Sequence, residues 1–314
     1  MKAGFPIYPK PGPIGGTLIR EVIALMRSRG IDLPITSHIL IATSGGSDSM
    51  ALAHLLVHFG RRVVDRSQIS LLHINHGWRG EESDGDEAFV ESIGKKWGVR
   101  VIAKRLTRPA ETSGKSLEEE ARTARKELFS EWAKREDANV LTAHHADDLA
   151  ETVLWRLLTG AVETHGAGIT FQHGVEMRPF LSLRKSRIQN YLREVGQSFR
   201  VDQTNFSNRF LRARIRSHLM PEVEKIFPRA VEHLANLGLK AQGSITGPSS
   251  GSYDSHDKIM APVAEILMGN AGLKLKRAHF GMVFEKSVAN ENWHGEIHLP
   301  DGWKLIREKK KKEK

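Results

Sequence analysis

The sequence predicts an α/β fold built on a doubly wound parallel sheet, followed by a basic helical stretch and a small α+β segment. Short apolar runs alternate with longer helix-like stretches through the first half of the chain, as in parallel sheets covered by helices on both faces. Three polar clusters each follow one of the apolar runs directly. Because such sheets bind ligands at the carboxyl ends of their strands, the clusters are expected to converge on one crevice.

The expected elements follow from apolar spacing. The first is an amphipathic helix over 17–29, whose apolar face carries Ile19, Val22, Ile23 and Met26. The run 38–43 is a buried strand that breaks at two glycines. Further strands are expected at 69–74, 101–106 and 139–143, and further helices at 50–59, 84–97, 116–135 and 146–158.

Composition shifts divide the chain. Residues 1–182 hold the α/β pattern, and a basic helical segment follows. A stretch rich in Gly and Ser is typical of a linker, and the turn signal Pro300-Asp301-Gly302 predicts a hairpin over 295–307. The expected units after residue 182 are therefore a helical segment at 183–241, a linker at 242–255, a small domain at 256–307 and a charged tail at 308–314.

The 314 residues carry a formal net charge of +10 and a pI near 9.8. Lysine and arginine that bind phosphates release condensed counterions, so this imbalance favours a nucleic-acid partner over a merely solvated basic surface. No apolar run is long enough to span a bilayer, and the N-terminus does not resemble a signal peptide. A cytoplasmic protein without a membrane partner is expected.

The chain contains no cysteine. This excludes disulfides, thiolate zinc sites, cysteine nucleophiles and persulfide sulfur transfer.

The first cluster is the loop Ser44-Gly45-Gly46-Ser47-Asp48-Ser49. Two glycines let the backbone approach a phosphate, the serines add donors, and the following helix directs its positive end at the anion. Asp48 repels an anion, so Mg²⁺ bridging to phosphate is its natural partner. The alternative is a glycine-rich turn with capping side chains. The absence of Gly-Lys-Ser/Thr excludes the common P-loop.

The second cluster is His73-Ile74-Asn75-His76-Gly77-Trp78-Arg79, whose histidines and arginine suit phosphates or a polar substrate. The alternative is a turn with ordinary polar histidines.

The third cluster runs from Thr142 to Thr152 and contains His144, Asp147, Asp148 and Glu151. Asp147 and Asp148 lie four and three residues before Glu151, so on a helix they share a face. Such an acidic pocket suits Mg²⁺ or an ammonium group; the alternative is helix capping plus solvated charge.

These clusters carry a resemblance. The string Ser-Gly-Gly-x-Asp-Ser resembles the pyrophosphatase loop of the N-type ATP pyrophosphatases, the PP-loop superfamily. His-x-Asn-His-Gly-x-Arg and His-His-x-Asp-Asp-x-x-Glu-Thr resemble segments of its tRNA(Ile)-lysidine synthetases. Further matches are the strings 120–125, 178–181, 202–205, 212–216 with Pro221, and 299–302. The resemblance covers about residues 38 to 307, with departures at Lys126 and Ala213.

The resemblance implies an adenine nucleotide alpha hydrolase-like fold and a carbon–nitrogen ligase that acts in tRNA modification. Such an enzyme adenylates the wobble cytidine of an isoleucine tRNA with a CAU anticodon, releases pyrophosphate, and joins the ε-amine of L-lysine to C2. The missing cysteines argue against thiolating and glutaminase-bearing members. The alternative is an ammonia-dependent amide synthetase of the NAD synthetase type, which the basic charge does not favour.

The resemblance also implies site roles. The cofactors are ATP and Mg²⁺, with Mg²⁺ at Asp48 and Asp148; the partners are tRNA and L-lysine, and a homodimer is left open. ATP is held by Ser44, Gly45, Gly46, Ser47, Asp48, Ser49, His73 and His76. The catalytic residues are Asp48, Arg122, Asp147 and Glu151, and Arg79, Arg125, His144 and Arg178 hold substrate or offset phosphate charge.

Overall fold

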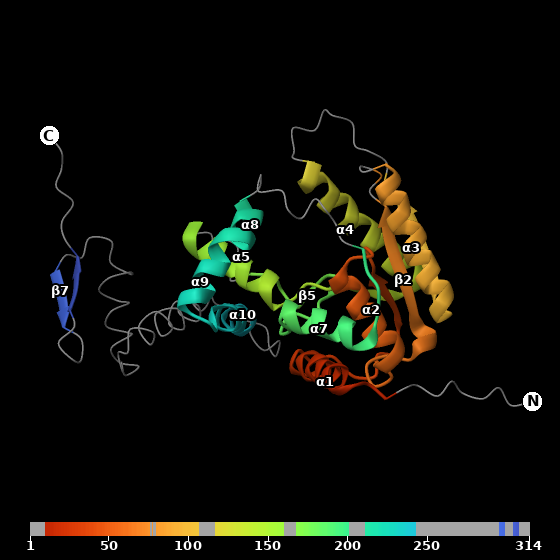
Figure 1. Ribbon diagram of the computed structural model, residues 1–314, viewed down its shortest axis with the longest axis horizontal. Coiled ribbons are helices and arrows are strands. Elements are labelled where there is room, and N and C mark those ends of the chain that lie inside the picture. The colour runs from red at the N-terminus through yellow and green to blue at the C-terminus, as the bar shows by residue number, and fades with distance from the viewer. Residues whose placement is uncertain are drawn as a thin grey trace, which may run out of the picture.

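The computed structural model describes residues 10–75, 77, 80–106, 117–159, 168–200, 211–242, 295–298 and 304–307 (Figure 1). The α/β part comprises α1 (Pro13–Ser28), β1 (His38–Ala42), α2 (Ser47–Phe59), β2 (Ile69–Asn75), α3 (Glu81–Trp97), β3 (Arg100–Arg105), α4 (Leu117–Glu136), β4 (Ala138–Leu141) and α5 (Ala146–Thr159), with a 3-10 turn at Arg66–Gln68. The predicted elements of this half are confirmed.

The remaining elements are β5 (Gln172–His173), β6 (Glu176–Met177), α7 (Lys185–Val195), α8 (Leu211–Arg214), a π-helical turn η3 (Ile215–Leu219), α9 (Met220–Ile226), α10 (Ala230–Ala241), β7 (Gly295–His298) and β8 (Lys304–Arg307). The strands β7 and β8 pair antiparallel from Gly295↔Arg307 to His298↔Lys304, which confirms the predicted hairpin.

The main sheet has the order β3-β2-β1-β4-β6-β5. All neighbours are parallel except β5 and β6 at one edge. The chain order reverses direction between β1 and β4, because β2 and β3 lie on one side of β1 and β4 on the other. This is the topological switch point, where the loops at the carboxyl ends of two neighbouring strands separate and leave a ligand crevice.

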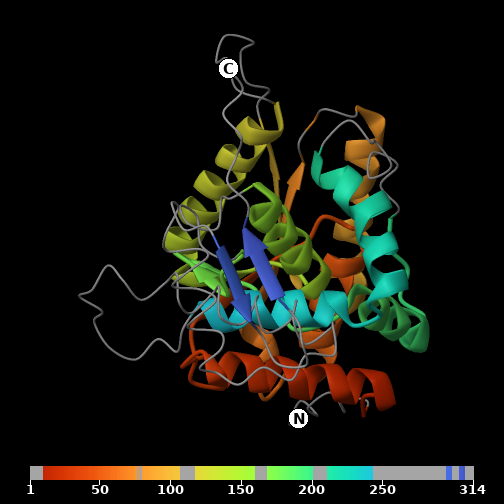
Figure 2. The same ribbon diagram turned by 90° about the vertical axis from the view of Figure 1, so that its left-hand side faces the viewer.

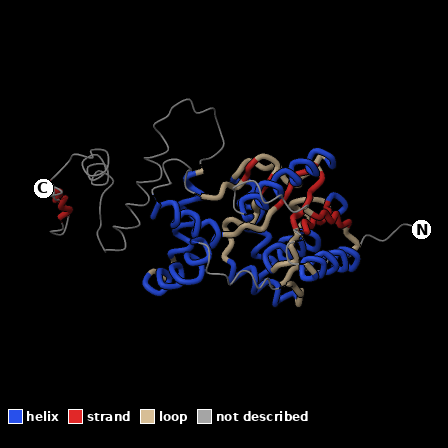
Figure 3. The backbone as a smooth tube through the Cα atoms, turned by 90° about the horizontal axis from the view of Figure 1, so that it is seen from above, coloured by secondary structure: helices blue, strands red, loops and turns tan. Residues whose placement is uncertain are grey.

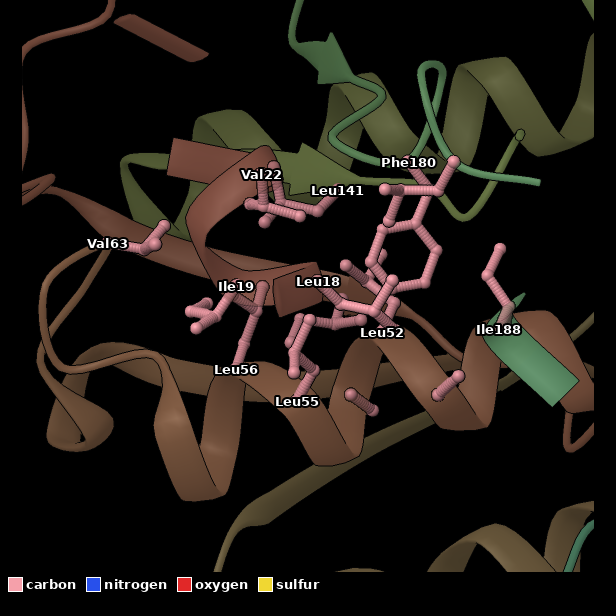
Figure 4. Close-up of a cluster of buried hydrophobic side chains, with 14 of the residues drawn as sticks. Leu18, Ile19, Val22, Leu52, Leu55, Leu56, Val63, Leu141, Phe180 and Ile188 are labelled. Carbon is pink, nitrogen blue, oxygen red and sulfur yellow. The ribbon is translucent and has the colours of Figure 1, made fainter. Parts of the chain in front are cut away.

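Successive residues of β1 enter different cores, because strand side chains alternate between faces. Ile39 and Ile41 join a large cluster with α1, α2 and α3, whereas Leu40 joins Phe129 and Trp132 of α4. The sheet therefore lies between α4 and the other helices (Figure 2). Figure 4 shows the larger cluster, in which Leu18 of α1, Leu52 of α2 and Phe180 meet.

The basic helices pack in two places. α7 lies against α1 and α2, and its Ile188, Tyr191 and Leu192 belong to the main core. α8, η3, α9 and α10 gather around α5 instead (Figures 1 and 3), where Ile215, Met220 and Val231 bury Ala150. The predicted linker lies almost wholly outside the described residues, and the predicted domain boundaries stay predictions.

Among the helices of the described residues, none combines the length and the apolar character that crossing a membrane requires.

Candidate active site

The glycine loop lies between β1 and α2, at the switch point. Gly45 has φ +89°, a left-handed conformation that only glycine adopts at low cost. The Ser49 hydroxyl donates to the Gly46 carbonyl (3.0 Å) and accepts from the Ser44 N–H (3.2 Å), so the loop folds over the first turn of α2. No side chain caps the N-terminus of α2 at Gly46. The backbone N–H groups at this helix end are thus positioned for an anion.

Arg200 clamps this loop from outside. Its backbone N–H donates to the Gly45 carbonyl (2.9 Å), and its aliphatic stem lies against Gly45. Its guanidinium donates to Asp86 on α3 (2.9 Å). The loop is therefore connected both to the end of the 197–200 segment and, through that side chain, to α3. Sequence patterns gave no sign of this contact.

His73 approaches the loop from β2. The side chain is buried, and its Nδ1–H donates to the Thr43 carbonyl directly before the loop (2.8 Å). In a neutral imidazole, this contact leaves Nε2 as an acceptor. Nε2 is buried and finds no hydrogen-bond partner among the described residues. The predicted site residues His76 and Arg79 lie outside the described residues.

His145 connects the first and third clusters. Its Nε2 lies 3.6 Å from the Asp48 carboxylate, and its Nδ1 lies 3.4 Å from Asp148 and 3.7 Å from Asp147. Burial opposes the charged imidazolium, but Asp148, Asp48 and Asp147 outweigh it and raise the pKa of His145. The switch point thus brings carboxylates from α2 and α5 together around one buried imidazole.

The carboxylates of Asp48 and Asp148 stay ionised. Burial raises the pKa of each carboxyl, but nearby positive groups lower both values: His145 and Lys185 act on Asp48, and His145, His144 and the arginines at 212 and 216 act on Asp148. The pKa of Asp148 falls to about 2. The Asp48 carboxylate is 26% exposed and lies 3.9 Å from the Lys185 ammonium. Asp48 is therefore a charged and partly exposed group beside the glycine loop.

Asp147 binds the start of α7. Its carboxylate accepts the Lys185 backbone N–H (2.7 Å) and faces the Arg184 guanidinium (3.3 Å). Arg184 also donates to Glu224 and Glu232, both at 2.7 Å. Through these contacts Asp147 connects α5 with the start of α7 and, by way of Arg184, with α9 and α10. The predicted catalytic role of Asp147 stays a prediction.

Glu151 and Asp148 face a guanidinium. Arg216 of η3 donates from Nε to Glu151 Oε1 (2.7 Å) and from Nη2 to Asp148 Oδ1 and Glu151 Oε2 (both 2.9 Å). Arg212 lies within 3.6–3.7 Å of the same two carboxylates. The predicted shared face of Asp148 and Glu151 exists, and a helix far along the chain covers it.

Two further arginines, Arg178 and Arg122, lie near each other, and Arg178 acts on His144. Arg178 is buried, donates to Glu176 (2.7 Å) and to the Thr170 carbonyl (2.9 Å), and its Nε has no partner among the described residues. Burial lowers the pKa of Arg178, and the charge of exposed Arg122 adds to that effect. Burial likewise lowers the pKa of His144 to about 4. Arg125 is exposed one turn beyond Arg122 on α4.

Comparison with known proteins agrees with this geometry. The PP-loop domain family matches residues 19–223. The tRNA(Ile)-lysidine synthase of Persephonella marina is 38% identical over 205 residues, which are 63% of this chain and 44% of that protein. The tRNA(Ile)-lysidine synthase of Chlorobaculum tepidum is 36% identical over 255 residues, which are 80% of this chain and 73% of that protein.

The chain spans less than half the length of several curated relatives, with 44% to 48% of each covered. Among solved structures, the U34-tRNA thiolase NcsA of Methanococcus maripaludis matches with a TM-score of 0.60 at 16% identity, over 76% of this chain and 81% of that one. This likeness shows a shared fold. With a family match over residues 19–223 and a relative covered over 73% of its length, the chain belongs to the PP-loop family and, within it, to the tRNA(Ile)-lysidine synthases.

Proposed function

We propose that this protein is an ATP-dependent ligase that converts the wobble cytidine of an isoleucine tRNA with a CAU anticodon to lysidine. The observation that carries the proposal is the junction at the switch point. There the phosphate-type loop with Asp48 and the acidic face of α5 meet through His145. A nucleotide and an amine substrate would thus bind next to each other, as a reaction with an adenylated intermediate requires.

The proposed reaction has two steps. The cytidine O2 attacks the α-phosphorus of ATP, the bond to the β-phosphate oxygen breaks, and pyrophosphate leaves. The neutral ε-amine of lysine then attacks C2, the bond from C2 to the AMP oxygen breaks, and the amine loses a proton. The activated base is the electrophile, so the protein must hold the triphosphate and the amine on the two sides of that base.

The loop and the start of α2 would hold the triphosphate. Asp48 fits a phosphate-bridging Mg²⁺, because Mg²⁺ is commonly held by one or two carboxylates together with phosphate oxygens, and Asp48 is charged and partly exposed. Asp148 fits less well as a second ligand, since Arg216 and the His145 backbone N–H occupy its oxygens. Bound Mg²⁺ would neutralise phosphate charge. The free acceptor on His73 is suited to a hydroxyl or amino group of the nucleotide.

Asp148 and Glu151 would hold the lysine amine, because two ionised carboxylates on one helix face select a cation. Arg122 and Arg178 would offset negative charge that develops on the phosphates, and their mutual repulsion within the empty protein is relieved when an anion binds. His144, in the loop before α5, and Arg125 on α4 would contact the same anion. The surplus positive charge would bind the tRNA backbone around the unstacked base.

The test is pyrophosphate release from ATP by the purified full chain. We expect release with the isoleucine tRNA transcript, formation of a lysine–tRNA adduct when L-lysine is added, and neither product with a CAU-anticodon methionine tRNA. Release that ignores tRNA but requires ammonium would overturn the proposal and favour an amide synthetase of the NAD synthetase type.

A further inference from the structure

The amine pocket assigned above is already filled by a side chain of the same molecule. Arg216 makes three hydrogen bonds to Asp148 and Glu151, at 2.7 to 2.9 Å. Glu151 is 4% exposed and Asp148 is 14% exposed. Both Glu151 oxygens accept from this one guanidinium. A substrate ammonium cannot make the same contacts while Arg216 stays in place.

Electrostatics explains why the Asp148–Glu151 pair needs a cation. Two carboxylates this poorly solvated would repel each other and lose hydration, at a cost that an adjacent cation removes. Arg212 stands farther away, at 3.6–3.7 Å, so Arg216 makes the close contact. Its guanidinium thereby supplies, inside the protein, what a substrate ammonium would supply from solution.

The local structure allows Arg216 to leave without unfolding its helix. The adjacent Ile215 is buried against Ala150 of α5 and anchors η3. The Arg216 side chain itself is 39% exposed and reaches the pocket from the solvent edge. Rotation about its side-chain bonds would move the guanidinium into water while the packed backbone stays in place. The π-helical turn at Ile215–Leu219 sets the direction from which it enters.

We propose that Arg216 is an internal competitor of the substrate amine, which occupies the Asp148–Glu151 pair until lysine displaces it. The inference rests on the proposed function of that pair and adds an exchange to it. Binding of lysine replaces one cation with another, so its observed affinity is the difference between two similar interactions. Lysine therefore binds the resting enzyme far more weakly than the pair alone would bind it.

The experiment measures the affinity of L-lysine for the full chain by titration calorimetry, without tRNA or ATP. Arg216→Ala should lower the Kd for lysine by roughly tenfold or more, because the competitor is gone. The matched control is Arg187→Ala, which removes a guanidinium of similar exposure that forms the same kind of paired contact with Glu21 on α1 and not with Asp148 or Glu151. That control should bind lysine like the wild type.

Arg216→Gln provides a second test, since it keeps the stem and a donor but removes the charge, and it decides the matter if the alanine variant aggregates. Free lysine should also raise the Tm of either variant more than that of the wild type. Unchanged or weaker lysine binding in the folded variants would overturn the proposal and make Arg216 a supporting residue of the pocket. Failure of the proposed function would be detected in a different assay, because pyrophosphate release from ATP in the presence of tRNA requires no lysine.

Discussion

Asp48 supplies the negative charge that the rest of the glycine loop lacks. It is the one acidic residue in the loop 44–49, and its contacts with His145 and Lys185 keep it ionised. Backbone N–H groups and hydroxyls can hold phosphate oxygens directly, but a carboxylate near a triphosphate acts through a cation. Replacing Asp48 by asparagine, which has the same shape but no charge, therefore tests this role of the loop most directly.

Asp48→Asn should reduce pyrophosphate release by at least about a hundredfold, because the amide keeps the shape but loses the charge that holds the cation. The assay is single-turnover pyrophosphate formation with tRNA and excess Mg²⁺. Affinity for tRNA, measured by filter binding, should change little. Asp65→Asn, at a 3-10 turn away from the crevice, should release pyrophosphate at the wild-type rate. Normal turnover in Asp48→Asn would show that the loop binds without this carboxylate.

Arg200 gives a second residue-scale prediction. Arg200→Ala should raise the KM for ATP by roughly tenfold with a smaller change in kcat, because the loop loses the side chain that holds it toward α3 before ATP binds. The backbone contact of residue 200 with Gly45 should remain. Steady-state pyrophosphate release against ATP concentration measures both constants.

A double-mutant cycle with Asp86→Asn separates this clamp from two independent effects. If the Arg200–Asp86 contact (2.9 Å) transmits the constraint, the KM of the double variant for ATP should be no higher than that of the more impaired single variant. Strictly additive losses would mean that Arg200 does not act on the loop through Asp86.

At the scale of elements, α1 shows what local sequence signals leave out. The helix was expected at 17–29, yet it begins at Pro13. Glycines at 15 and 16 disfavour helix, but the carboxylate of Glu194 accepts the backbone N–H groups of Ile14 and Gly15 (2.9 and 3.0 Å). The cap comes from the end of α7, and Tyr191 packs against the same turn. The first turn is thus formed by a tertiary contact.

Glu194→Ala should therefore lower the free energy of unfolding by about 1 kcal/mol, as loss of a helix N-cap does. Glu194→Gln, which keeps an acceptor oxygen, should lose less. Urea unfolding followed by circular dichroism gives both values. Equal losses in the two variants would show that charge, and not the acceptor contact, stabilises the start of α1.

The strands and the three clusters were accessible to sequence reasoning because their signals are local. Apolar runs at 38–43 and 139–143 define buried strands, and in a parallel sheet the residues that follow them share one edge. The pairing of the residues that complete the site was not accessible. Arg216 meets Glu151 across 65 positions, and nothing in the spacing of either segment pairs them. His145 was visible in the motif, but its contact with Asp48 needed the strand order.

At the scale of the whole molecule, partly buried histidines contribute to the response to acid. Burial lowers the pKa of His54 to about 3 and of His58 to about 4, with further lowering by nearby cations, and His144 behaves similarly. Unfolded histidines titrate near 6.5. Between that value and about 4 the unfolded chain binds more protons than the folded one, so stability falls as the pH falls. His145, whose pKa is raised, acts in the opposite direction.

His58→Phe should weaken this acid sensitivity, because it removes one partly buried imidazole with a lowered pKa while keeping a ring against Trp97. The difference between the urea midpoints at pH 7.5 and pH 5 should shrink relative to the wild type. A substitution of exposed His173 should leave that difference unchanged. A difference of the same size in His58→Phe would show that His58 contributes nothing to acid unfolding.

The positive charge of the whole molecule should act mainly at one edge of the sheet. Under the proposed function, a wobble base reaches the switch point only if the tRNA backbone crosses the carboxyl ends of the strands, where Arg122 and Arg125 lie on α4. Arg61 and Arg62 are equally exposed but follow α2, at the opposite edge. Each contact between a basic side chain and a phosphate contributes roughly 0.7 to 0.9 to the slope of the logarithm of the tRNA binding constant against the logarithm of the salt concentration. Replacing Arg122 and Arg125 by Gln should therefore reduce the slope for tRNA binding by up to about 1.8, whereas the same replacement of Arg61 and Arg62 should not. Equal reductions in the two double variants would mean that tRNA responds to net charge and not to an oriented surface.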